Sequence, residues 1–251
     1  MKKTVQFIFI ISLLLMSCEN SKKGKYPSKL KSNSIKNENK VSEKTSPNSI
    51  SNDEITEFVP KGFNVFEKIK GDLNNDGIDD YVIVIKAINK KNIIIDEYRG
   101  ELDRNRRGII VLLYENGVYK QFLKNVNCFS SENEDGGVYF QPELYINIEK
   151  GKLFIHFGHG RYGYWKYTFR LKNSDLELIG YDSSSNNGPV IVSETSINFL
   201  TNRKIEKINT NRNANSGEEV FEEINVNLKA KPLLKFSKIE DFDDLELLEL
   251  K

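Results

Sequence analysis

The sequence predicts a mainly β domain of antiparallel sheets, built from consecutive hairpins in a sandwich-like or partial propeller-like arrangement. Three observations predict this fold class. Apolar and polar residues alternate with a period of two in several short segments, compact turn pairs separate these segments, and helical periodicity is scarce. Because such short turns join neighbouring strands directly, the sheets are expected to be antiparallel.

The predicted strands are rich in β-branched and aromatic residues and are bounded by turn residues. Asn116-Gly117 and Lys150-Gly151 lie between apolar runs, which is a strong signal for a tight hairpin. The expected strands and strand pairs are residues 80–86, 107–123, 143–158, 164–172, 176–182 and 195–209.

Helices and loops take up the remaining segments. Residues 54–59 are compatible with one short helical turn, and residues 239–250 with a weak acidic helix. Loops are expected at residues 173–176, 183–189 and 209–219, where Asn, Ser and Gly are concentrated.

The N-terminus has the features of an export signal. Lys2 and Lys3 precede an apolar run that is too short to span a bilayer, and the run ends in "LMSC" at Cys18. This ending resembles the lipobox of bacterial lipoproteins, in which the cysteine is lipidated. The resemblance implies a signal peptide at residues 1–17, lipid on Cys18 and a location in the bacterial cell envelope, facing the periplasm or the surface. The alternative is an ordinary signal peptide with a chance cysteine.

Residues 18–53 are expected to form the lipidated cysteine and a disordered tether. Lys, Asn and Ser dominate this segment, so it cannot bury enough apolar surface to offset the entropy of ordering. Residues 54–251 then form a single mainly β domain that is mildly acidic, which excludes a nucleic-acid partner. We expect a monomer, with no disulfide framework, because Cys128 has no partner once Cys18 carries lipid.

The segment "GDLNNDGIDD" at residues 71–80 predicts a calcium loop. Calcium binds six to eight oxygen ligands. The oxygens expected to serve are the side chains of Asp72, Asn74, Asp76 and Asp80 and the backbone carbonyl of Ile78. The alternative is an acidic hairpin turn without an ion. Hard oxygen ligands without histidine favour structural calcium over catalytic zinc.

This loop is not an EF-hand, because its twelfth position is Ile83 and no helix pattern flanks it. It resembles instead the strand–loop–strand calcium loop of FG-GAP and VCBS-type repeats. Only one such loop is present, so a full propeller is not expected. Together with "EDGGVYFQPEL" and "FIHFGHGRYGYWKYTFRLK", it also resembles small lipoproteins of Gram-negative, often Bacteroidota-like, bacteria, for which the resemblance implies a fold and no activity.

A second notable stretch is "FIHFGHGRYGYW" at residues 154–165. Aromatic side chains offer flat contact area at low entropic cost, and an arginine offers a fork for a carboxylate or phosphate. The candidate binding residues are His156, His159, Arg161, Tyr162 and Tyr164. The alternatives are a purely structural hairpin and a catalytic site that uses a histidine.

Three functions follow from these features. The first is a membrane-anchored, non-enzymatic binding module for a protein or glycan, stabilised by calcium. The second is an immunity-type or inhibitor lipoprotein directed against a periplasmic toxin or lysozyme. The third is a hydrolase that uses His156 or His159.

Overall fold

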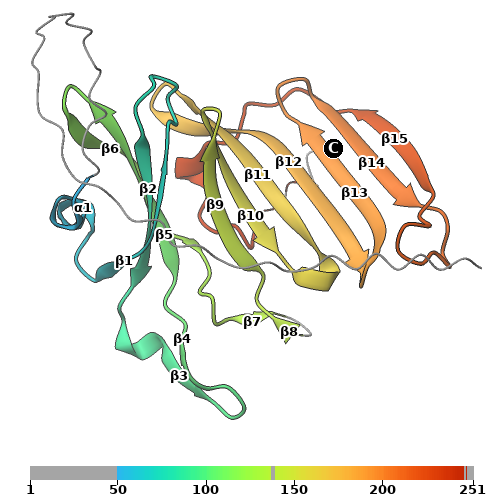
Figure 1. Ribbon diagram of the computed structural model, residues 1–251, viewed down its shortest axis with the longest axis horizontal. Helices are drawn as coiled ribbons and strands as arrows, with labels where there is room; N and C mark the ends of the chain where they lie inside the picture. Colours follow the sequence, from blue (N-terminus) through green and yellow to red (C-terminus); the bar gives the residue numbers. More distant parts are fainter. Residues whose placement is uncertain (1–49, 137–138, 246, 248–251) are drawn as a thin grey trace, which may run out of the picture. The chain divides into compact units, whose positions relative to one another are not determined.

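The computed structural model describes residues 50–136, 139–245 and 247, and it confirms the mainly β fold (Figure 1). The signal segment, Cys18 and the tether up to residue 49 lie outside the described residues. In the part of the chain that is described, no helix is long and apolar enough to cross a membrane.

Two larger sheets and two short ribbons hold the strands, and every pairing is antiparallel. The first sheet has the order β1-β2-β5-β6, and the second has the order β15-β14-β13-β12-β11-β10-β9. Neither sheet closes into a barrel or a propeller. The strands of these sheets are β1 (Phe63–Gly71), β2 (Asp80–Ala87), β5 (Arg107–Glu115), β6 (Val118–Phe129), β9 (Glu143–Glu149), β10 (Lys152–Gly158), β11 (Gly163–Lys172), β12 (Asp175–Asn187), β13 (Val190–Asn198), β14 (Arg203–Asn209) and β15 (Phe221–Asn227).

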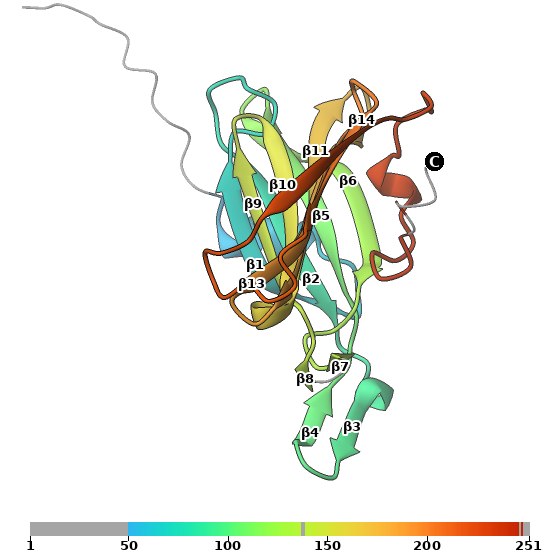
Figure 2. The same ribbon diagram turned by 90° about the vertical axis from the view of Figure 1, so that its right-hand side faces the viewer.

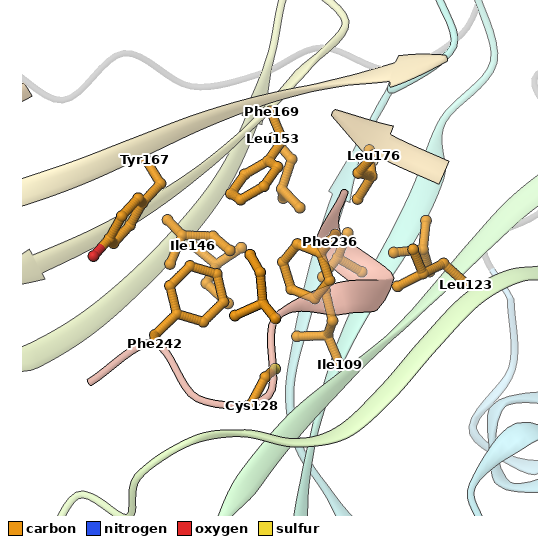
Figure 3. Close-up of a cluster of buried hydrophobic side chains, with 14 of the residues drawn as sticks. Ile109, Leu123, Cys128, Ile146, Leu153, Tyr167, Phe169, Leu176, Phe236 and Phe242 are labelled. Atoms are coloured by element: carbon orange, nitrogen blue, oxygen red, sulfur yellow. The ribbon is translucent and has the colours of Figure 1, made fainter. Parts of the chain in front are cut away.

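The main core lies between the two larger sheets. Val82, Ile109, Ile155 and Phe169 are fully buried there, two from each sheet. Figure 3 shows part of this cluster of apolar side chains. Burial of each such side chain stabilises the folded state by roughly 1.5–3 kcal/mol, so this shared core holds the sheets together.

A second, smaller core covers the opposite face of the four-stranded sheet. Helix α1 (Asn52–Phe58) begins with a capping box formed by Ser51 and Glu54, and it buries Ile55 against Ile83 and Ile110. Strands β2 and β5 are therefore buried on both faces, which explains their unbroken apolar sequences.

Ile50 is also buried in this smaller core, and Asn52 begins the helix. The boundary expected between tether and domain at residue 53 is therefore too late in the sequence. The folded part already includes Ile50, because its side chain and the helix cover the sheet.

The C-terminal segment packs into the main core, as Figure 3 shows for Phe236 and Phe242. It contains one 3₁₀ turn, η3 (Phe236–Lys238), and then runs irregularly. The Phe242 amide donates to the Cys128 carbonyl at 3.0 Å, and the Asn125 side chain donates to the Ile239 carbonyl at 2.7 Å. The acidic helix expected at residues 239–250 is therefore absent from 239–245, where the chain forms bends and turns and is hydrogen-bonded to β6.

The two ribbons extend from one end of the sheets (Figure 2). They are β3 (Ile93–Asp96) with β4 (Gly100–Asp103), and β7 (Asp135–Gly136) with β8 (Tyr139–Phe140). A 3₁₀ turn, η1 (Lys90–Asn92), precedes β3. The buried Lys86 ammonium pairs with Asp103 of β4 at 3.0 Å and also with Glu132, which fixes the base of the longer ribbon.

The loop expected at residues 183–189 is mostly strand. Residues 183–187 continue β12, where Ser184 is paired with Tyr164 on one side and with Glu194 on the other. Because β12 lies inside the sheet, hydrogen bonds to both neighbours override the weak strand propensity of Ser and Asn. Only Gly188 and Pro189 remain between β12 and β13.

Candidate functional site

The predicted calcium loop joins β1 to β2. Gly77 has a φ of +86°, a conformation that glycine adopts without strain. The carboxylate of Asp72 accepts hydrogen bonds from the amides of Asp76 (3.1 Å) and Gly77 (2.9 Å), and the Asn74 side-chain oxygen accepts from the Asp76 amide (2.9 Å). The oxygens of Asp72 and Asn74 therefore converge on one amide.

Asp76 and Ile78 complete the tip of this loop. One Asp76 oxygen accepts from the Ile78 amide at 2.8 Å, and the other accepts from the Asn74 side-chain nitrogen at 2.9 Å. Asp72, Asn74 and Asp76 thus lie together at the positions that the sequence assigned to the first three ligands.

Asp80 has a different environment, because it is fully buried at the start of β2. One of its oxygens accepts from the amides of Leu73 (2.9 Å) and Asn74 (3.2 Å), and the other accepts from the Tyr114 amide of β5 (3.0 Å). Burial raises the pKa of this carboxyl, and the three amides act in the opposite direction. Asp80 therefore ties the loop to the neighbouring strand.

The loop supplies carboxylate and amide oxygens of the kind that calcium prefers. In this structure the oxygens of Asp72, Asn74 and Asp76 accept hydrogen bonds within the loop, and both Asp80 oxygens accept from backbone amides. Asp80 differs from the other three in being fully buried. Within the described ranges, no group of three or more His, Cys, Asp and Glu residues is arranged to hold a metal ion.

The loop also contacts the second sheet. A Cβ built on Gly151, in the turn between β9 and β10, would lie 1.9 Å from the Asn75 side chain. The side chain of Asn75 thus occupies the space above this glycine, so the loop bridges β1–β2 and the turn after β9.

The second candidate stretch lies at the tip of the β10–β11 hairpin. The 3₁₀ turn η2 (Gly160–Tyr162) connects the strands. Gly163 follows with a φ of +107°, and a Cβ there would lie 1.9 Å from the Ser184 carbonyl oxygen. This close approach to β12 requires glycine, and it fixes the orientation of the turn.

Three of the five candidate binding residues lie together in this turn. His159, Arg161 and Tyr162 line an open cavity of about 410 Å³. The rings of His159 and Tyr162 are 5.2 Å apart, and Nε2 of His159 donates to the Phe140 carbonyl at 3.1 Å. Arg161 is exposed.

His156 and Tyr164 lie outside this cavity. They stack on each other on the outward face of β10 and β11, with ring centroids 5.3 Å apart. Burial and the nearby Lys166 ammonium lower the pKa of His156, so its imidazole is neutral at pH 7. The structure therefore divides the predicted set into a cavity group and a neighbouring aromatic pair.

Three further side chains that line the cavity were not predicted from the sequence. They are those of Phe140, Gln141 and Glu143, and Phe140 is 74% exposed. The position of Glu143 could have been predicted from the sequence. The turn at Lys150-Gly151 sets the register of β9 and β10, and this register pairs Glu143 with Gly158 at the hairpin tip.

The candidate catalytic groups have few reactive neighbours. Neither His156 nor His159 forms a hydrogen bond or an ion pair with a carboxylate of a described residue. Cys128 is fully buried, and burial raises the pKa of its thiol, which disfavours the nucleophilic thiolate.

In comparisons with known proteins, no family model, curated protein or solved structure matched the chain.

Proposed function

We propose that this chain is an envelope-anchored, non-enzymatic binding module whose hairpin-tip cavity receives a protein or glycan partner. The observation that carries the proposal is the cavity of about 410 Å³, which is lined by His159, Arg161 and Tyr162 together with Phe140, Gln141 and Glu143. Its volume falls within the range of ligand pockets, roughly 300–1,000 Å³.

The chemistry of the cavity supports recognition of a polar partner with flat faces. The rings of Phe140, His159 and Tyr162 offer apolar contact surfaces, and Gln141 both donates and accepts hydrogen bonds. Arg161 provides a planar set of donors for a carboxylate. Lipid on Cys18 would hold this site at the membrane, and calcium bound by Asp72, Asn74 and Asp76 would stabilise the loop between β1 and β2.

Substituting Arg161→Ala together with Tyr162→Ala is expected to abolish partner capture while folding is retained. Arg161 is exposed and Tyr162 is half-buried in a surface turn, so the unfolding free energy should change by no more than about 1 kcal/mol. Each protein is immobilised and exposed to envelope extract, and bound proteins and oligosaccharides are identified by mass spectrometry.

The matched control for this experiment is Tyr145→Ala with Arg203→Ala. Both side chains are exposed on the seven-stranded sheet and neither lines the cavity. Capture that survives in the control and is lost in the tip variant supports the proposal, and a captured toxin or lysozyme would assign the inhibitor function. Equal capture by both variants would contradict a role for the tip.

Calcium is expected to raise the melting temperature, because an ion that binds only the folded state stabilises it. At a concentration about 100 times the dissociation constant the gain is about 2.7 kcal/mol, or about 5–10 °C for a domain of this size. Melting curves are recorded in millimolar calcium and in chelator, for the wild type, Asp76→Ala and the control Asp79→Ala.

Asp79 is a useful control because it lies in the same loop, is not one of the expected ligands, and pairs its carboxylate with Lys70 at 2.9 Å. The calcium shift should persist in Asp79→Ala and vanish in Asp76→Ala. Superimposable curves of the wild type in calcium and in chelator would exclude the calcium site.

A further inference from the structure

A second, mainly apolar cavity shares no lining residue with the hairpin tip. It measures about 600 Å³ and lies between the first residues of β12, the turn after β13 and the segment that follows β15. Its walls are mainly apolar, and they include Leu178, Phe199, Leu228, Leu233, Leu234 and Leu245.

Backbone hydrogen bonds fix the walls of this cavity. The Leu178 amide donates to the Leu234 carbonyl at 2.8 Å, and the Leu228 amide donates to the Asn202 carbonyl at 2.7 Å. Phe236, two residues after Leu234, is buried in the main core. The cavity is therefore preformed, because both ends of its C-terminal wall are anchored.

The rim of the cavity carries a concentrated positive charge. Lys229, Lys231, Lys235 and Lys238 all line it, all four are exposed, and no Asp or Glu is among its lining residues. None of these lysines forms an ion pair with a residue in the described ranges, in contrast to Lys70, Lys120 and Lys166, each of which pairs with a carboxylate.

We propose that this cavity binds a long-chain fatty acid, with the acyl chain against the leucine walls and the carboxylate among the four lysines. An apolar interior requires an apolar chain, and a cationic rim selects an anionic head over a neutral one. The volume lies within the roughly 300–1,000 Å³ of ligand pockets. The inference is independent of the hairpin-tip proposal, because the two cavities share no lining residue.

The test uses the full chain carrying Cys18→Ser, so that no attached acyl chain competes. Displacement of the fluorescent fatty acid cis-parinarate is measured with palmitate and with hexadecanol. Palmitate should bind about tenfold more tightly than the alcohol, which corresponds to about 1.4 kcal/mol. Equal affinities, or no displacement by palmitate, would overturn the proposal.

Two variants separate the contributions of the walls and the rim. Lys229→Glu with Lys231→Glu should weaken palmitate binding about tenfold or more, as expected when charges around a carboxylate are reversed. The matched control is Lys61→Glu with Lys124→Glu, two exposed lysines that do not line the cavity. Leu233→Glu should abolish palmitate binding, because it places a carboxylate against the acyl chain. A cooperative melting curve of this variant shows that it is folded.

The identity of the head group is tested by comparing dodecanoate with dodecyl phosphate. Tighter binding of the carboxylate supports the fatty acid, whereas tighter binding of the phosphate would overturn that assignment. An equal loss of palmitate binding in the rim variant and in the Lys61/Lys124 control would overturn the role of the rim.

Discussion

Replacing Phe236 with alanine is expected to lower the free energy of unfolding by about 3–5 kcal/mol, the range measured for buried aromatic truncations. The Phe236 side chain is fully buried, and its ring lies 5.2 Å from Phe169 and 5.6 Å from Phe242 between centroids. Removal of the ring leaves a cavity where the C-terminal segment meets the second sheet. Urea unfolding of the wild type and the variant measures the change.

The control for this prediction is Phe221→Ala on the edge strand β15. Its side chain is 38% exposed, so truncation should destabilise the domain by about 1 kcal/mol or less. If Phe236→Ala lowered the free energy of unfolding as little as this control does, the C-terminal segment would not be part of the cooperative core.

Asp80→Ala is expected to destabilise the domain by about 3–6 kcal/mol. The substitution removes the acceptor of three backbone amides, those of Leu73, Asn74 and Tyr114. Each donor left unsatisfied in a buried position costs roughly 1–3 kcal/mol. Chemical denaturation in chelator isolates this effect from that of calcium.

The neighbouring substitution Asp79→Ala provides the comparison in this case. Asp79 is part-exposed and pairs with Lys70 at the surface, where such pairs contribute little. Similar stabilities of the two variants would show that the Asp80 carboxylate does not organise the loop.

The sequence predicted the hairpins because their signals are local. Asn116-Gly117 and Lys150-Gly151 adopt positive φ values in their turns, and β-branched and aromatic residues surround them. Strand β15 was missed, although Ile224 and Val226 alternate with Asn225 and Asn227, which is a local signal for a strand.

The helix predicted at residues 239–250 does not form at 239–245. Ile239 and Phe242 are three residues apart, which is close to helical periodicity, yet both are buried in the main core from a segment that is not helical. Only contacts with the two sheets determine this path, and these contacts are not encoded by local spacing.

The two cavities differ in how far the sequence could predict them. The cluster of Gly, His, Arg and Tyr indicated the hairpin tip, but Phe140 and Gln141 reach it only through the folded chain. The lysine-rimmed cavity combines Leu178, Phe199 and Leu228 from three distant segments, so no motif could reveal it.

The claim that the hairpin tip is a binding site is tested most directly by photo-cross-linking in intact cells. The photoreactive residue p-benzoylphenylalanine is placed at Arg161 or, as a control, at Tyr98, which is 90% exposed on the ribbon of β3 and β4. It inserts into C–H bonds of proteins and sugars alike. We predict a discrete adduct at position 161 that is absent at position 98. The same adducts at both positions, or none at position 161, would contradict the proposed function.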